Sequence, residues 1–135
     1  MSVASFEKDL EALRRLAWEG LYREDDVEDL LYQVRNDLPL TDVAHDSGPL
    51  VSRYCAMRRE LNRIEAPELQ PYVQALSEIF DYLAQLLHHG VALLAVAWRS
   101  QELREQQELV GPIGRQGERL RRVVDELDEL AAARR

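Results

Sequence analysis

The sequence has few of the residues that build cross-linked or turn-rich folds. It contains one cysteine (Cys55), 6 glycines and 5 prolines, and aromatic residues make up 7% of the chain. One cysteine excludes an internal disulfide, and the shortage of glycine and proline argues against a β-sandwich with many turns. The most apolar stretch, residues 91–98, is far shorter than the roughly 20 residues that span a bilayer. Since the N-terminal residues also lack the apolar run of a signal peptide, we expect a cytoplasmic protein.

Basic charge is also scarce. The 135 residues include 25 acidic and 17 basic side chains, for a net charge of −8. This charge disfavours binding to nucleic acid or to anionic membranes. Lys8 is the one lysine, so all the other basic residues are arginine. This preference for arginine over lysine is typical of a GC-rich, bacterial gene. The acidic residues concentrate in residues 1–49, which could favour head-to-tail or antiparallel contacts between chains or simply form a solvated surface.

Apolar residues, 46% of the chain, recur at spacings of three and four, which predicts amphipathic helices. We expect helices over residues 5–20, 27–38, 50–64, 67–110 and 115–133, with a loop at 39–49 and a turn at 111–114. The fold class is therefore all-α: one domain (1–135) forming an antiparallel bundle of four to five helices. It divides into an acidic N-terminal helical hairpin (1–38), the loop (39–49), core helices (50–110) and a C-terminal helix (111–135).

The segment from Val73 to Trp98 carries the strongest apolar pattern. Its two parallel apolar rows predict one long central helix covered on two sides, with a seam typical of coiled coils. A continuous helix of roughly 40 residues would be about 60 Å long, which exceeds a compact domain of this size. Either it kinks near Gly90, or it projects and pairs with a second copy, while the C-terminal helix folds back or crosses to that partner. The predicted interface residues are Leu83, Leu87, Leu94, Trp98, Leu120, Val123, Leu127 and Leu130.

A second hypothesis is a regulatory module that binds a small anionic or aromatic ligand between helices. Aromatic side chains could line the pocket, and arginine guanidinium groups could hold an anion through paired hydrogen bonds. The candidate ligand residues are Trp18, Tyr54, Arg59 and Arg63.

Reactive and metal-binding residues form no recognised motif. His88 and His89 are adjacent, so on a helix their side chains point about 100° apart. Two side chains of one helix that bind the same metal ion are three or four residues apart in the sequence. Cys55 lacks a neighbouring base, and the acidic run from Glu24 to Asp29 lacks the pattern of a calcium loop. We therefore predict no catalytic residues, no metal and no cofactor, with a metal-dependent enzyme using His88 or His89 as the weakest alternative.

The function best supported by these patterns is a non-enzymatic helical protein–protein interaction module. We expect it to be a homodimer, or to bind another protein, as an adaptor, chaperone-like or structural accessory protein.

Overall fold

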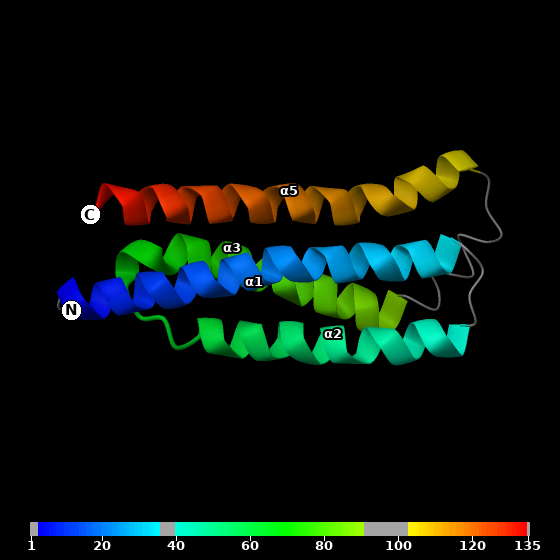
Figure 1. Cartoon of the computed structure of the whole chain (residues 1–135), viewed down its shortest axis with the longest axis horizontal. Coiled ribbons are helices and arrows are strands. Elements are labelled where there is room, and N and C mark those ends of the chain that lie inside the picture. Colours follow the sequence, from blue (N-terminus) through cyan, green and yellow to red (C-terminus); the bar gives the residue numbers. More distant parts are fainter. Residues whose placement is uncertain (1–2, 36–39, 91–102, 135) are drawn as a thin grey trace.

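The structure is a computed structural model that describes residues 3–35, 40–90 and 103–134. Within these residues it contains helices and no strand: α1 (Val3–Arg35), α2 (Leu40–Leu61), the 3₁₀ turn η1 (Pro67–Leu69), α3 (Gln70–Gln85), the π-helical turn η2 (Leu86–Gly90) and α5 (Leu103–Ala133). Successive long helices run in opposite directions, and α1 and α3 each pack against both α2 and α5 (Figure 1). The predicted all-α antiparallel bundle is confirmed. No described helix is long and apolar enough to cross a membrane.

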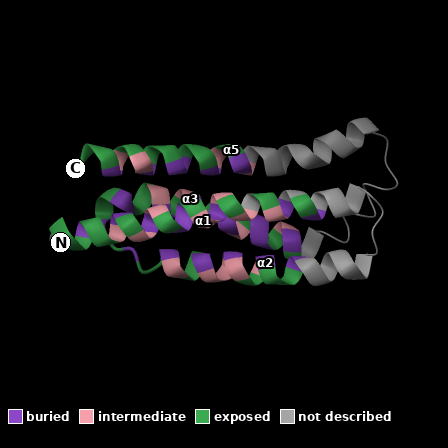
Figure 2. Ribbon diagram, in the orientation of Figure 1, coloured by how far each residue is buried: buried purple, intermediate pink, exposed green. Residues whose placement is uncertain are grey.

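The core consists of the apolar stripes that the sequence spacing predicts. All four long helices carry buried residues, coloured purple in Figure 2. They include Phe6, Leu10, Leu13 and Ala17 of α1, Tyr54, Met57 and Leu61 of α2, Leu76, Phe80 and Leu83 of α3, and Leu120, Val124 and Leu127 of α5. Burial of a large apolar side chain contributes about 1.5–3 kcal/mol, so these stripes supply the main folding energy.

Helix α1 is one continuous helix of 33 residues, so the predicted N-terminal hairpin is wrong. Gly20 was expected to end the first helix, but it lies inside α1 and is buried. The acidic cluster from Glu24 to Asp26 likewise lies within the helix rather than at the start of a second one. Gly20 has a packing role, because the Phe80 ring occupies the space where a side chain would stand.

Helix α2 begins at Leu40, so the predicted loop over 39–49 is wrong for residues 40–49. Pro49 lies inside the helix despite the hydrogen bond that it removes. The helix ends at Leu61, and Asp9 of α1 stabilises the turn that follows. One carboxylate oxygen of Asp9 accepts hydrogen bonds from the backbone amides of Glu65 and Ala66 at 3.1 and 3.0 Å.

The predicted long central helix is also wrong in its extent. Helix α3 has 16 residues and gives way to the π-helical turn Leu86–Gly90, close to the kink considered above. Residues 91–102 lie outside the described residues. Helix α5 runs through residues 111–114, which were expected to form a turn. The two apolar rows of α3 are indeed covered on two sides, but α2 and α5 of the same chain cover them.

Candidate functional site

Most of the predicted interface residues belong to the core of a single chain. Five of the eight are buried, namely Leu83, Leu87, Leu120, Val123 and Leu127. A sixth, Leu130, is partly buried. Their apolar surface is covered by neighbouring helices, so in this fold it is not left over for a second copy. Leu94 and Trp98 lie outside the described residues, and their part in an interface stays a prediction.

The predicted ligand residues do not come together in one pocket. Tyr54 is buried beside Phe80, with ring centroids 5.6 Å apart. Tyr54 and Arg59 line a cleft of about 270 Å³ between α2 and α3. Arg63 lines a different cleft between α1 and the end of α2, and Trp18 lies on the side of α1 that faces α5. The structure therefore separates these four residues into three places.

The residues considered for metal binding and catalysis are also dispersed. The part of the chain that the structure describes holds no cluster of three metal-ligating side chains. His88 is exposed in η2, and Cys55 is a partly buried free thiol on α2. A metal-dependent role for the histidines stays a prediction that metal analysis of the purified protein can test.

Arginine–carboxylate pairs join each neighbouring pair of helices around the bundle. They are Arg53–Glu19 between α2 and α1, Arg58–Asp81 between α2 and α3, Arg119–Glu78 between α5 and α3, and Arg14–Asp128 and Arg134–Glu7 between α1 and α5. Partly exposed pairs contribute about 0–1 kcal/mol each. Their arrangement therefore helps to fix the helix register more than the total stability.

The Arg53–Glu19 pair has the closest geometry of these contacts. Nε and Nη2 of Arg53 donate to the two carboxylate oxygens of Glu19, both at 2.6 Å. Hydrogen bonding to Glu19 raises the pKa of Arg53 above its ordinary value, against the opposing effect of burial. The charges of Glu19 and Glu60 act in the same direction. Arg53 therefore stays charged and links α2 to α1 at every physiological pH.

An aromatic pair is exposed on the face formed by α1 and α5. Trp18 and Tyr22 are four residues apart on α1, so they are neighbours on its surface. Their ring centroids are 6.0 Å apart with the planes tilted by 35°. Trp18 is 37% exposed and Tyr22 is 67% exposed, so two neighbouring aromatic rings lie at the surface of the bundle.

Asp128 of α5 fixes the position of Trp18. Its Oδ1 accepts hydrogen bonds from the Trp18 indole Nε1 at 3.2 Å and from the Arg14 Nε at 3.0 Å. One edge of the indole is therefore anchored to α5, while part of the ring surface remains in water. Rigid aromatic side chains held in this way make favourable contact surfaces, because little conformational entropy is lost when they are covered.

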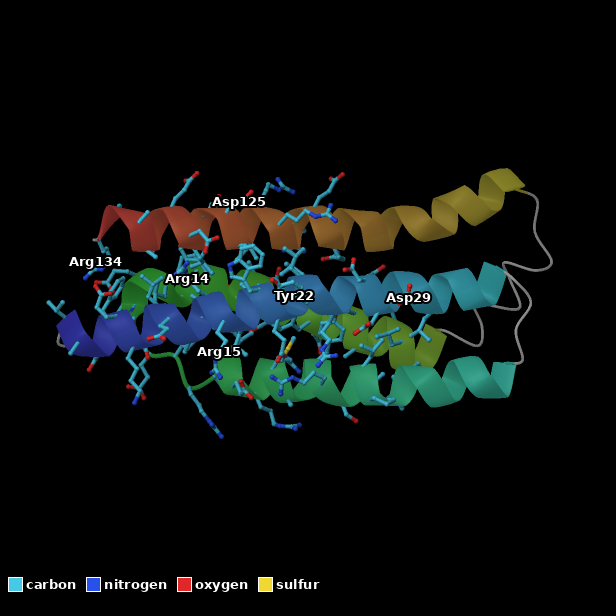
Figure 3. The ribbon with its side chains drawn as sticks, viewed as in Figure 1. Arg14, Arg15, Tyr22, Asp29, Asp125 and Arg134 are labelled. Carbon is cyan, nitrogen blue, oxygen red and sulfur yellow. The ribbon has the colours of Figure 1, made fainter. Side chains whose placement is uncertain are left out.

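The two helices that carry this face, α1 and α5, also expose charged side chains of both signs. Asp25 and Asp29 follow Tyr22 in the sequence of α1. Figure 3 labels Asp29 on α1 and Asp125 on α5. Arg121 and Arg122 are exposed on α5, one turn before Asp125. The surface defined by Trp18, Tyr22 and these charged residues is called the aromatic face below. Sequence reasoning considered Trp18 and Tyr22 only as aromatic residues that could line a ligand pocket. It missed that they form an exposed pair, although both fall beside the apolar stripe of α1.

Comparisons with protein-family models, curated proteins and solved structures find no match for this chain. Its function must therefore be argued from the geometry of its own residues.

Proposed function

We propose that this protein is a non-enzymatic helical interaction module that forms a homodimer through the aromatic face. The observation that carries the proposal is the exposed Trp18–Tyr22 pair on a bundle whose apolar stripes are already buried. Exposed aromatic side chains that are held rigidly are characteristic of interface centres. This face replaces the apolar ridge of α3 as the basis for association, because the described part of that ridge is internal.

A second copy is the occupant best matched to the charges of this face. In a two-fold contact whose axis runs along the helices, α1 of one copy lies over α5 of the other. That arrangement brings the carboxylates of Asp25 and Asp29 toward the guanidinium groups of Arg121 and Arg122, while the aromatic pairs meet near the axis. Opposite charges on the two helices make the face complementary to itself.

The contact would extend beyond the two aromatic rings. A stable dimer of standard size buries about 800 Å² on each partner, and one aromatic side chain supplies about 150–250 Å². The remaining area would come from the neighbouring turns of α1 and α5. The proposal includes a cytoplasmic location, which the single cysteine favours because no disulfide framework is needed.

Sedimentation equilibrium at micromolar concentrations tests the proposal. We expect a reversible monomer–dimer equilibrium for the native protein and a dissociation constant at least about tenfold larger for the double variant Trp18→Ala, Tyr22→Ala. Tyr82→Ala is the matched control, because Tyr82 is also 37% exposed but lies on α3. A native protein that remains monomeric refutes the homodimer. Dimers that Tyr82→Ala weakens as much as the double variant show that the wrong face was chosen.

A further inference from the structure

Arg14, Trp18 and Tyr22 form a row along α1, because residues four apart in a helix lie on the same side of it. Asp128 of α5 contacts the first two members of this row. Its Oδ1 lies 3.0 Å from both Nε and Nη2 of Arg14 and 3.2 Å from Nε1 of Trp18. Trp18 in turn contacts Tyr22, with ring centroids 6.0 Å apart. One carboxylate of α5 is therefore linked to both aromatic rings, directly to Trp18 and through it to Tyr22.

The hydrogen bond to Asp128 uses the only polar atom of the Trp18 side chain. The indole Nε1–H donates and accepts nothing, so this bond decides which way the polar edge of the ring points. A charged acceptor makes the bond stronger than a neutral one would. The ion pair with Arg14 restrains the same carboxylate oxygen, so the acceptor is itself held in position.

A side chain that is ordered before association loses less rotational freedom when a partner covers it. Without the bond to Asp128, the exposed indole could adopt other rotamers and would be immobilised only on contact with a second copy. Immobilising one such side chain at an interface raises the dissociation constant about two- to tenfold. The bond to Asp128 removes this cost from the association step.

We infer that Asp128 is a positioning residue for the homodimer, which holds Trp18 in the orientation that the second copy contacts. This inference rests on the proposed function, because Asp128 acts through the aromatic face. The Arg134–Glu7 ion pair, 2.8 Å long, also joins α5 to α1. Glu7 precedes Trp18 by 11 residues, about 16 Å along the helix, so this pair holds the same two helices together without holding the indole.

Time-resolved fluorescence anisotropy measures the positioning of Trp18 in the monomer, before any contact with a second copy. In the background Trp98→Phe, Trp18 is the sole tryptophan, and dilution to nanomolar concentrations favours the monomer. We expect Asp128→Ala to increase the fast component of the anisotropy decay, which reports rotation of the ring on the picosecond-to-nanosecond timescale. Asp128→Asn should increase it less, because the amide oxygen can still accept the indole N–H. Glu7→Ala is the matched control and should leave the decay unchanged.

Sedimentation equilibrium of the same variants measures the effect on association. Asp128→Ala should raise the dissociation constant about two- to tenfold, Asp128→Asn should raise it less, and Glu7→Ala should leave it unchanged. If the native protein dimerises but Asp128→Ala alters neither the ring motion nor the affinity, or only one of them, the role of Asp128 is wrong while the homodimer stands. Equal effects of Glu7→Ala and Asp128→Ala, or of Asp128→Asn and Asp128→Ala, overturn it as well. A native protein that remains monomeric removes the homodimer and this role together. Circular dichroism spectra establish that all variants are folded.

Discussion

Gly20 of α1 and the ring of Phe80 of α3 are in direct contact across the bundle. A β-carbon on Gly20 would lie 2.5 Å from Cε1 of Phe80, closer than any normal carbon contact. The Phe80 ring also packs on Tyr54 of α2. The missing side chain at position 20 therefore allows Phe80 to fill the centre of the bundle.

Replacing Gly20 with alanine should destabilise the protein. The added methyl group must displace a fully buried ring, and overpacking of this kind costs about 1–3 kcal/mol. The better helix propensity of alanine offsets about 0.5–1 kcal/mol of that cost. We expect the free energy of unfolding, measured with urea, to fall by about 1 kcal/mol, and by about 2.5 kcal/mol at most.

Gly48→Ala provides the matched control. Gly48 is also helical, but it is exposed, and apart from its two chain neighbours a β-carbon there meets nothing within 4 Å. A β-carbon at position 48 also crowds the ring of the following Pro49, which opposes the gain in helix propensity, so the free energy of unfolding should change by less than about 1 kcal/mol. If Gly20→Ala is no more destabilising than Gly48→Ala, the packing role assigned to Gly20 is incorrect.

The same glycine explains part of the difference between the predicted and observed helices. Spacing of apolar residues predicted the fold class and most of the core, because the stripe positions depend only on helical periodicity. Helix ends were predicted from the positions of glycine and proline. Tertiary contacts can override the local conformational preferences of these residues. Thus Gly20 and Pro49 lie inside helices although both suggested boundaries.

The candidate sites were less accessible to sequence reasoning. The periodicity of α3 showed that two of its sides are covered, but it could not show that α2 and α5 of the same chain cover them. Whether Arg63 has a carboxylate partner depends on the side chains of α1, which approach only in the folded bundle. Exposed Trp18 and Tyr22 were visible in principle, since both lie off the stripe.

Pro49 offers a test of the helical geometry of residues 40–49. A proline in a helix interior removes one backbone hydrogen bond and costs up to about 3 kcal/mol relative to alanine. Because Pro49 is exposed and inside α2, Pro49→Ala should raise the thermal unfolding midpoint and increase stability by about 1–3 kcal/mol. If residues 40–49 were instead a loop, the substitution would lower stability or leave it unchanged, since proline restricts the unfolded chain.

The Arg53–Glu19 pair should contribute measurably to the attachment of α2 to α1. Glu19→Gln removes the charge but keeps the shape, and we expect a loss of about 1 kcal/mol because the pair is bidentate but partly exposed. A double-mutant cycle with Arg53→Met measures the coupling. Arg59→Met, which removes an exposed cation that forms no ion pair among the described residues, should change stability little.

The pH dependence of Arg53 follows from the direction of its pKa shift. A cation whose pKa is raised in the folded state stabilises the fold fully below its ordinary pKa and loses that contribution as the pH rises through the raised pKa. Titration of Arg53 should therefore change the measured coupling little between about pH 6 and pH 9. If the Arg53–Glu19 coupling energy disappeared between these pH values, the coupling could not come from the charge of Arg53.

The most direct measurement for the proposed homodimer is the accessibility of Trp18 itself. In the variant Trp98→Phe, Trp18 is the sole tryptophan. Acrylamide quenching of its fluorescence then measures how accessible the Trp18 indole is to solvent and quencher. The homodimer predicts a quenching constant that falls as protein concentration rises from nanomolar to high micromolar, with no such fall when Tyr22→Ala is added. A constant that is the same at every concentration, in a protein shown to dimerise by sedimentation, would contradict the assignment of the aromatic face as the interface.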